Sequence, residues 1–225
     1  MEGPTHVAII IDGNRRFARK NRLNPLKGHE YGVQRIWDIF DWAKELGIKE
    51  LTFYTFSTEN FKRDKIEVDY LMKLFYREFD KLLKSGKLEK NKIRIRFIGR
   101  LYMFDMKIQD KMKELMDHTK SFDGFTANFC MAYGGRVEIV DAVNRLIEKG
   151  VKKVDEDMIF KNLYLQSEPD LIIRTSEQRI SNFLMWQSAY SEIIFLPDKL
   201  WPEFTKQDLI DCVGEFKRRT RRFGK

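Results

Sequence analysis

Apolar and polar residues follow two spacings along the chain, one typical of strands and the other of helices. Short runs rich in β-branched and aromatic residues predict buried strands at 7–11, 51–56, 93–98, 125–133, 170–173 and 193–196. Apolar residues repeated every three or four positions predict helices at 30–46, 66–84, 105–119, 137–147, 155–165 and 204–216. Because strands and helices alternate with mostly short loops, we expect an α/β fold with a parallel sheet and helices on both faces.

The first predicted strand leads into a stretch suited to binding an anion. Its apolar run ends at Asp12, and Asp-Gly-Asn is typical of a tight turn. Residues 15–20 are mostly basic, and a basic helix start after a glycine turn suits a phosphate group. A bound phosphate would repel Asp12 unless a cation such as Mg²⁺ lay between them, so Asp12 is a candidate metal ligand. Alternatively, Asp12 only caps the turn, and the arginines form a basic face exposed to solvent.

Two more polar segments follow predicted strands. Residues 57–63 offer a hydroxyl, an amide, an aromatic ring and an arginine. Residues 174–183 contain two arginines and two serines, which suit a second diphosphate, and Glu192 follows as a possible second carboxylate for a metal. Since ligand sites in parallel sheets lie beyond the carboxyl ends of the strands, we expect these segments to meet residues 12–16 in one crevice.

The helix predicted at 66–84 carries Leu, Met and Phe residues along one side. Such a stripe is normally part of the core. Met and Phe also fill irregular space well, so the same side chains could line a long apolar cavity.

Composition and charge narrow the class of protein. The chain has 225 residues, of which 43% are hydrophobic, which suits one α/β domain spanning 1–225 and excludes global disorder. Its net charge of +8 favours phosphorylated ligands, acidic membrane surfaces or nucleic acid, but no nucleic-acid module is recognisable. Cys130 and Cys212 lack metal-ligand spacing, which predicts free thiols in a reducing, cytoplasmic setting. No signal peptide or apolar run of membrane-spanning length is evident.

Five motifs, taken together and in order, resemble the cis-prenyltransferase family of undecaprenyl diphosphate synthase-like enzymes. They lie at 6–16, 56–63, 132–136, 174–187 and 221–224, so the resemblance extends over nearly the whole chain. The resemblance implies a homodimer with a six-stranded, mostly parallel sheet and an apolar tunnel. It also implies Mg²⁺-dependent condensation of isopentenyl diphosphate with an allylic diphosphate, such as farnesyl or geranylgeranyl diphosphate, to form cis double bonds.

The resemblance also implies roles for individual residues. Asp12 is expected to be the catalytic, Mg²⁺-linked carboxylate, with Glu192 as a further metal ligand, and Ser57 and Asn60 to assist removal of a proton from isopentenyl diphosphate. The allylic diphosphate is expected to contact Gly13, Asn14, Arg15, Arg16 and Phe17, with His29 nearby. Further substrate contacts are expected from Thr58, Glu59, Phe61 and Arg63. Isopentenyl diphosphate is expected at Arg174, Arg179, Ile180 and Ser181, with Arg222 and Gly224 of the tail reaching the partner subunit's active site.

Several positions depart from the family pattern. Phe17 and Phe61 stand where the family usually has tryptophan. Pro25 replaces a frequent basic residue, a loss that Lys27 could offset. Ser176 is followed directly by glutamate, without the usual glycine, so this loop is one residue shorter. We expect the shorter loop to affect affinity for isopentenyl diphosphate and not the fold.

The sequence leaves three alternatives to cis-prenyl chain elongation. Non-catalytic partner subunits of the same fold tend to lack the first-strand aspartate, whereas this chain has Asp12. A nucleic-acid-binding protein would show affinity that falls steeply with salt and no need for Mg²⁺. A third possibility is prenyl transfer to a non-isoprenoid acceptor. Because a polyprenyl product leaves into a bilayer, we also expect transient association with a membrane surface.

Overall fold

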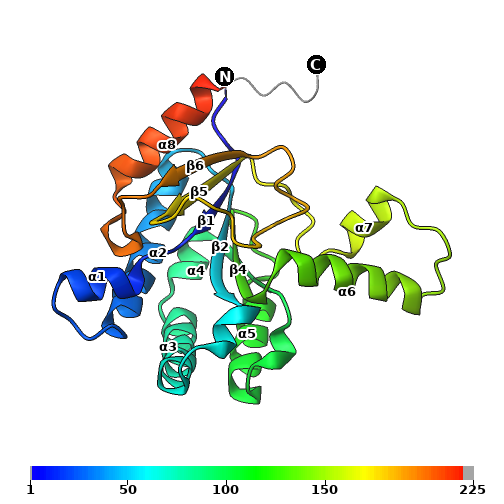
Figure 1. The fold of residues 1–225 in the computed structure, drawn as a ribbon, viewed down its shortest axis with the longest axis horizontal. Helices are drawn as coiled ribbons and strands as arrows, with labels where there is room; N and C mark the ends of the chain where they lie inside the picture. Colours follow the sequence, from blue (N-terminus) through cyan, green and yellow to red (C-terminus); the bar gives the residue numbers. More distant parts are fainter. Residues whose placement is uncertain (1, 220–225) are drawn as a thin grey trace.

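Six strands form one sheet in the computed structural model, which describes residues 2–219 (Figure 1). The order across the sheet is β3-β4-β2-β1-β5-β6, and every neighbouring pair is parallel. The strands are β1 (His6–Ile10), β2 (Glu50–Ser57), β3 (Ile93–Ile98), β4 (Phe125–Tyr133), β5 (Leu171–Thr175) and β6 (Glu192–Leu196). The predicted α/β fold with a parallel six-stranded sheet is confirmed.

The helices agree with the predicted periodicity, and the ends of the predicted elements differ from the observed ends by no more than three residues. The α-helices are α1 (Asn14–Lys20), α2 (Lys27–Glu45), α3 (Lys65–Lys84), α4 (Lys87–Asn91), α5 (Met106–Thr119), α6 (Gly135–Glu148), α7 (Glu156–Asn162) and α8 (Lys206–Arg218). Short 3₁₀ helices are η1 (Thr58–Lys62), η2 (Leu101–Met103) and η3 (Trp201–Glu203). Side chains of Asp64, Asp105 and Thr205 accept hydrogen bonds from backbone N–H groups in the first turns of α3, α5 and α8, which explains where these helices begin.

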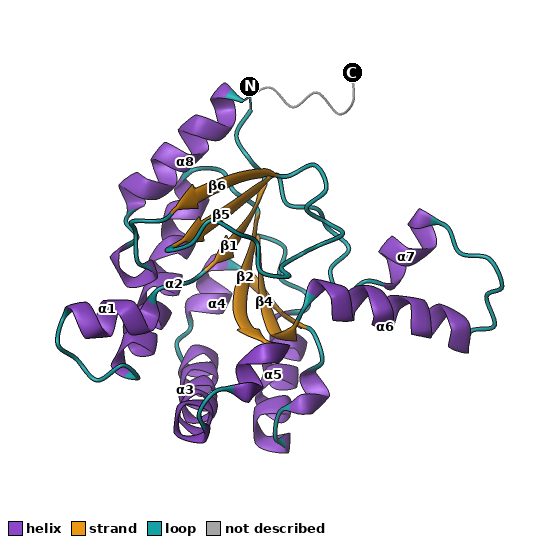
Figure 2. Ribbon diagram, viewed as in Figure 1, coloured by secondary structure: helices purple, strands orange, loops and turns teal. Residues whose placement is uncertain are grey.

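One face of the sheet carries most of the core. Helices α2, α3, α5 and α8 contribute to this cluster, together with strand residues such as Phe53 and Phe129. The other face has a smaller cluster that includes Leu165 and Phe183, and loops rather than helices supply its cover. The sheet is flanked by helices, as predicted, although α6 and α7 pack on each other and project away from it (Figure 2).

Strand β1 lies in the middle of the sheet, and all five of its residues are buried. The chain first extends the sheet on the β2 side of β1 and later on the β5 side. At such a switch in direction, the loops that follow adjacent strands diverge and leave a crevice at the carboxyl ends. The loops after β1, β2 and β5 are the three polar segments that the sequence singles out.

Candidate active site

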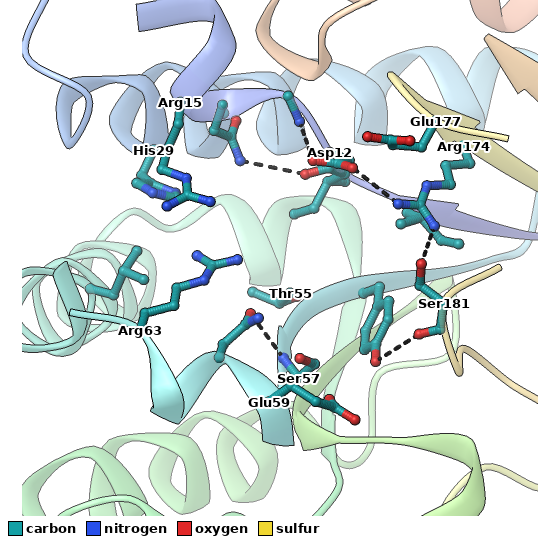
Figure 3. A pocket seen from close by; sticks show the side chains of 18 of the residues that line it. Asp12, Arg15, His29, Thr55, Ser57, Glu59, Arg63, Arg174, Glu177 and Ser181 are labelled. Atoms are coloured by element: carbon teal, nitrogen blue, oxygen red, sulfur yellow. Dashed lines mark hydrogen bonds and ion pairs between the residues drawn. The ribbon is translucent and has the colours of Figure 1, made fainter. Parts of the chain in front are cut away.

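A crevice with a volume of about 890 Å³ opens at the carboxyl ends of β1, β2 and β5 (Figure 3). In Figure 3, Asp12, Arg15 and His29 lie along one side, and Ser57 and Glu59 lie across from them. The cations that line the crevice are Arg15, Arg16, Arg19, Arg63, Arg136, Arg174 and Arg179, and the carboxylates are Asp12, Glu59 and Glu177. An excess of guanidinium groups over carboxylates makes this crevice a site for multiply charged anions.

Asp12 is held at the turn after β1 by backbone and hydroxyl contacts to β5. Its backbone N–H donates to Thr175 Oγ1 at 3.1 Å, and the same hydroxyl donates to the Asp12 carbonyl at 2.7 Å. The Asp12 carboxylate accepts a hydrogen bond from the backbone N–H of Gly13 at 2.7 Å. Gly13 has φ of 107°, and a Cβ at this position would lie 2.3 Å from Ser176 Oγ, so only glycine allows this turn. The carboxylate is thereby held facing the crevice.

Arg174 connects the turn after β1 with the loop after β5. Its side chain is 5% exposed, and its Nη2 donates to Asp12 Oδ2 at 3.0 Å. Its Nη1 donates to Ser181 Oγ at 2.5 Å and to the carbonyl of Arg179. Arg174 Nε is buried and has no hydrogen-bond partner among the described residues, and such an atom is typical of a site that completes its contacts with a ligand. The first and third polar segments therefore meet, as predicted.

Glu67 of α3 neutralises the cations at the other end of the crevice. Its carboxylate accepts from Arg15 Nη1 at 3.1 Å and from Arg63 Nη1 at 2.9 Å, and it lies 3.4 Å from His29 Nε2. Sequence reasoning missed Glu67, and its position four residues after Arg63, near the start of the predicted helix 66–84, was the available signal. A diphosphate that enters this end would replace the buried Glu67 carboxylate as the partner of both arginines.

Burial, followed by the positive charge of Arg63, lowers the pKa of His29 to about 4, against its ordinary value of 6.5. The unfolded chain therefore binds more protons than the folded chain between about pH 4 and 6.5, and stability should fall as the pH drops through this window. We expect the free energy of unfolding to lose about 3 kcal/mol from this group across that range. Urea unfolding of the wild type and His29→Gln at several pH values measures the difference; parallel curves for the two proteins would contradict the expectation.

The loop after β2 begins with a capped 3₁₀ turn. Asn60 Oδ1 accepts from the Ser57 backbone N–H at 3.2 Å, while the Ser57 side chain accepts from the backbone of Asn60. These reciprocal contacts mean that both side chains stabilise the start of η1. Both residues nevertheless line the crevice.

The loop after β5 has a residue in the left-handed region just before the position at which the family's glycine is absent. Ser176 has φ of 71°, and its carbonyl accepts from Arg16 Nη1 at 3.0 Å. The next residue, Glu177, bonds Arg179 at 2.8 Å and lies 3.3 Å from Arg16. Glu177 therefore bridges the arginines expected for the two diphosphates.

Most predicted site residues line the crevice. They are Asp12, Gly13, Asn14, Arg15, Arg16, His29, Ser57, Glu59, Asn60, Arg63, Arg174, Arg179 and Ser181. Residues Phe17, Thr58, Phe61 and Ile180 lie beside it without lining it. Phe17 packs against Tyr31 with the two rings tilted, and Phe61 packs against Phe56 and Phe104. Lys27 also lies off the lining and pairs with Glu30 at 3.1 Å.

The structure does not bring Glu192 to the crevice. Glu192 is the first residue of β6 and is level with Leu171 and Val7, at the amino ends of their strands. Asp12 follows the opposite, carboxyl end of β1. Glu192 instead pairs with Arg219 at 2.9 Å. The prediction that both carboxylates bind one metal is therefore wrong for the described residues of one chain. The strand predicted at 193–196 already placed Glu192 at an amino end, whereas Asp12 lies at a carboxyl end of the same parallel sheet.

The crevice also contains four residues, from the basic segment 15–20 and the motifs at 132–136 and 174–187, for which no individual role was expected. These are Arg19, Arg136, Glu177 and Asn182. Their positions within polar loops were the only available signal. Arg222 and Gly224 lie outside the described residues.

One wall of the crevice is apolar. Ile36 and Val33 of α2 face Leu71, Leu74 and Phe75 of α3 across it. The stripe on α3 thus serves both as core and as crevice wall. Within residues 2–219, no helix is long and apolar enough to cross a membrane.

A site that joins arginine-rich anion positions to an apolar wall defines an enzyme for diphosphates with hydrocarbon tails. Residues 10–224 match the family model described as "Putative undecaprenyl diphosphate synthase", and the chain belongs to this family. It is a cis-prenyltransferase, an enzyme of cis-prenyl chain elongation.

Two relatives illustrate the similarity. The tritrans,polycis-undecaprenyl-diphosphate synthase (geranylgeranyl-diphosphate specific) of Pyrococcus horikoshii is 44% identical, over 99% of this chain and 87% of the relative. An isoprenyl transferase of Thermus thermophilus is also 44% identical, over 99% of this chain and 89% of the relative.

A solved structure of lavandulyl diphosphate synthase from Lavandula x intermedia, in complex with dimethylallyl diphosphate, has a TM-score of 0.93 and 34% identity. The match covers 99% of each chain. A probable undecaprenyl diphosphate synthase from Campylobacter jejuni has a TM-score of 0.86 and 35% identity, with complete coverage of both chains.

Proposed function

We propose that this enzyme condenses isopentenyl diphosphate with an allylic diphosphate, such as farnesyl or geranylgeranyl diphosphate, in a Mg²⁺-dependent reaction that yields a Z-polyprenyl diphosphate. The observation that carries this proposal is the contact of 3.0 Å between Arg174 and Asp12. It joins two arginine-rich ends into one crevice, beside a wall that suits a hydrocarbon chain. Two diphosphates bound at these ends would have their reacting carbons near one another.

The allylic diphosphate is assigned to the end formed by α1 and α3. Arg15 and Arg63 already share a carboxylate there, and His29 lies within the same cluster. Cleavage of the allylic C–O bond builds negative charge on the leaving diphosphate. Fixed guanidinium groups stabilise that charge more than they stabilise the intact substrate, which lowers the barrier.

Isopentenyl diphosphate is assigned to the end formed by the loop after β5. Arg174, Arg179 and Ser181 offer donors there, and Arg174 is held by its own bonds to this loop. A buried arginine with little freedom loses less entropy on binding than an exposed one. This arrangement supports binding of the acceptor in one orientation.

The Asp12 carboxylate suits a magnesium ion that is bound by both the protein and the substrate phosphates. It is about one-third exposed (36%), and no cluster of three His, Cys, Asp or Glu side chains among the described residues forms a complete metal cage. Mg²⁺ prefers such a site, with one or two carboxylates, substrate phosphates and several waters. When bound, it would supply further positive charge to the leaving diphosphate.

The apolar wall between α2 and α3 supports a tunnel for the growing chain. Leu71, Leu74 and Phe75 extend from the polar crevice along α3 toward the buried Phe79 and Leu82. An apolar wall also excludes water from the carbocation-like carbon of the allylic substrate. The length of the product then depends on how far this wall continues.

We also propose a homodimer that associates transiently with a membrane surface. Helices α6 and α7 project from the sheet, and Val140 and Ile147 of α6 are largely exposed, at 53% and 62%. Exposed apolar side chains on a projecting helix pair favour a protein partner. An apolar product and a net charge of +8 favour contact with an anionic bilayer.

The decisive experiment is incubation of the full chain with labelled isopentenyl diphosphate, Mg²⁺ and one allylic diphosphate at a time, followed by chromatography of the products. Dimethylallyl, farnesyl and geranylgeranyl diphosphate are the allylic substrates to compare. We expect chains extended by whole isoprene units, and loss of product with excess EDTA that returns on adding Mg²⁺. The proposal would be contradicted if isopentenyl diphosphate were incorporated with none of the three allylic substrates. Full activity in excess EDTA would contradict its Mg²⁺ dependence.

A further inference from the structure

Glu59 differs from the other carboxylates that line the crevice. Asp12 contacts Arg174 and Arg16, and Glu177 contacts Arg16 and Arg179. Glu59 forms no ion pair with any residue that the structure describes, and its partners are neutral donors. It is therefore the crevice carboxylate that has no arginine to neutralise it.

Glu59 is exposed to solvent, and two neutral hydrogen bonds orient its side chain. Thr58 Oγ1 donates to Glu59 Oε2 at 3.1 Å, and Asn182 Nδ2 donates to Glu59 Oε1 at 3.4 Å. Partial burial opposes ionisation, but hydrogen bonds from the backbone of Glu59 itself and from Ser57, Thr58 and Asn182 outweigh it and lower the pKa of Glu59. The side chain is therefore an ionised proton acceptor at neutral pH.

The position of Glu59 suits the hydrogen that must be lost. In isopentenyl diphosphate, one carbon separates C2 from the oxygen of the diphosphate, so the acceptor of the C2 proton must lie close to the diphosphate site. Asn182, which bonds Glu59, directly follows Ser181 of that site. Asn182 is itself fixed, because its carbonyl and Oδ1 accept from the backbone N–H groups of Gly135 and Arg136 at 2.7 and 2.8 Å.

The other candidates for this role are already engaged. Asn60 and Ser57 cap η1 through reciprocal contacts, and an amide is a poor base. Asp12 lies across the crevice from Glu59 and accepts from two guanidinium groups (Figure 3). Among the crevice residues that the structure describes, Glu59 combines negative charge with hydrogen bonds from neutral donors and forms no ion pair.

We propose that Glu59 is the general base that removes a C2 proton from isopentenyl diphosphate. The allylic C–O bond breaks and its electron pair leaves with the diphosphate, while the C3–C4 double bond supplies the pair for the new bond between C4 and the allylic C1. The C2–H pair then forms the C2–C3 double bond, and the proton passes to the Glu59 carboxylate and onward to solvent. A carboxylate suffices because a hydrogen beside a carbocation is strongly acidic. This inference rests on isopentenyl diphosphate being the acceptor, as proposed above.

The test compares wild type, Glu59→Gln and Glu59→Asp with isopentenyl diphosphate that carries hydrogen or deuterium at C2. Glu59→Gln keeps a hydrogen-bonding side chain without the base, so we expect kcat to fall about 100-fold or more while KM for both substrates changes little. We also expect a larger primary deuterium isotope effect on kcat in this variant, and partial recovery of kcat in Glu59→Asp. Glu89→Gln, on α4 and remote from the crevice, is the matched control and should behave as wild type.

Three outcomes would overturn the proposal. They are a kcat in Glu59→Gln within about threefold of wild type, a rise in KM alone, and a loss of kcat without any increase in the isotope effect. Circular dichroism of each variant shows whether it is folded. If Glu59→Gln does not fold, the kcat and isotope effect of Glu59→Asp are compared with those of the wild type instead. A wild-type enzyme that does not consume isopentenyl diphosphate would instead refute the proposed function itself.

Discussion

Replacing Asp12 with alanine should reduce product formation by about 1,000-fold or more while leaving the protein folded. The substitution removes the carboxylate that suits the metal ion and the partner that orients Arg174 Nη2. Asp12 is about one-third exposed (36%), so water screens its ion pairs, and we expect the free energy of unfolding to change by only about 1 kcal/mol. Turnover of labelled isopentenyl diphosphate and urea unfolding measure the two effects.

A matched control for Asp12 lies on the outside of α2. Asp38 has similar exposure, at 33%, and accepts from Arg35 at 2.9 Å, but it does not line the crevice. Asp38→Ala should keep turnover close to that of the wild type. Near-normal product formation by Asp12→Ala, or equal losses in both variants, would contradict the assignment of Asp12.

Replacing Gly28 with alanine should damage both stability and activity. A Cβ on Gly28 would lie 1.9 Å from the carbonyl oxygen of Asn14 and 3.2 Å from Ala18 Cβ, so α1 would have to move away from α2. Overpacking of this kind costs about 3 kcal/mol of unfolding free energy. The shift of α1 would also displace Arg15 and Arg16, so KM for the allylic substrate should rise more than KM for isopentenyl diphosphate.

Gly214 provides the comparison for Gly28. It lies in α8, and the nearest atom to an added Cβ is Arg218 Nη1 at 3.7 Å. Gly214→Ala should stabilise the protein by about 0.5–1 kcal/mol, because alanine loses less backbone entropy than glycine in a helix. Thermal unfolding of both variants, with steady-state kinetics for each substrate, tests the pair. A Gly28→Ala protein as stable as Gly214→Ala would refute the predicted clash.

The local elements and the meeting of three loops could be predicted because their causes are local or topological. The apolar run of β1 and the stripe of α3 follow directly from side-chain spacing. Parallel strands end at one edge of the sheet, so the segments that contain Asp12, Ser57 and Arg174 had to meet there.

The strand predicted at 193–196 already put Glu192 at an amino end, so its expected pairing with Asp12 conflicted with a parallel sheet, and the register of β6 confirms that position. Other site residues have positions that depend on distant packing. Phe17 and Phe61 occupy positions of the family's tryptophans, yet they pack against Tyr31 and against Phe56 rather than lining the crevice. Their contacts depend on where whole elements come to rest.

The amino-acid sequence by itself determined the alternating elements, the turn at Gly13 and the supply of positive charge, because these depend on neighbouring residues and on composition. Only the tertiary structure decided which charge each carboxylate faces. Asp12 meets Arg174 across 162 positions of the chain, Glu67 meets Arg15 across 52, and Glu59 meets an amide of Asn182 instead of an arginine. Such pairings arise when the sheet and helices pack together, since packing brings into contact side chains that are far apart in the sequence.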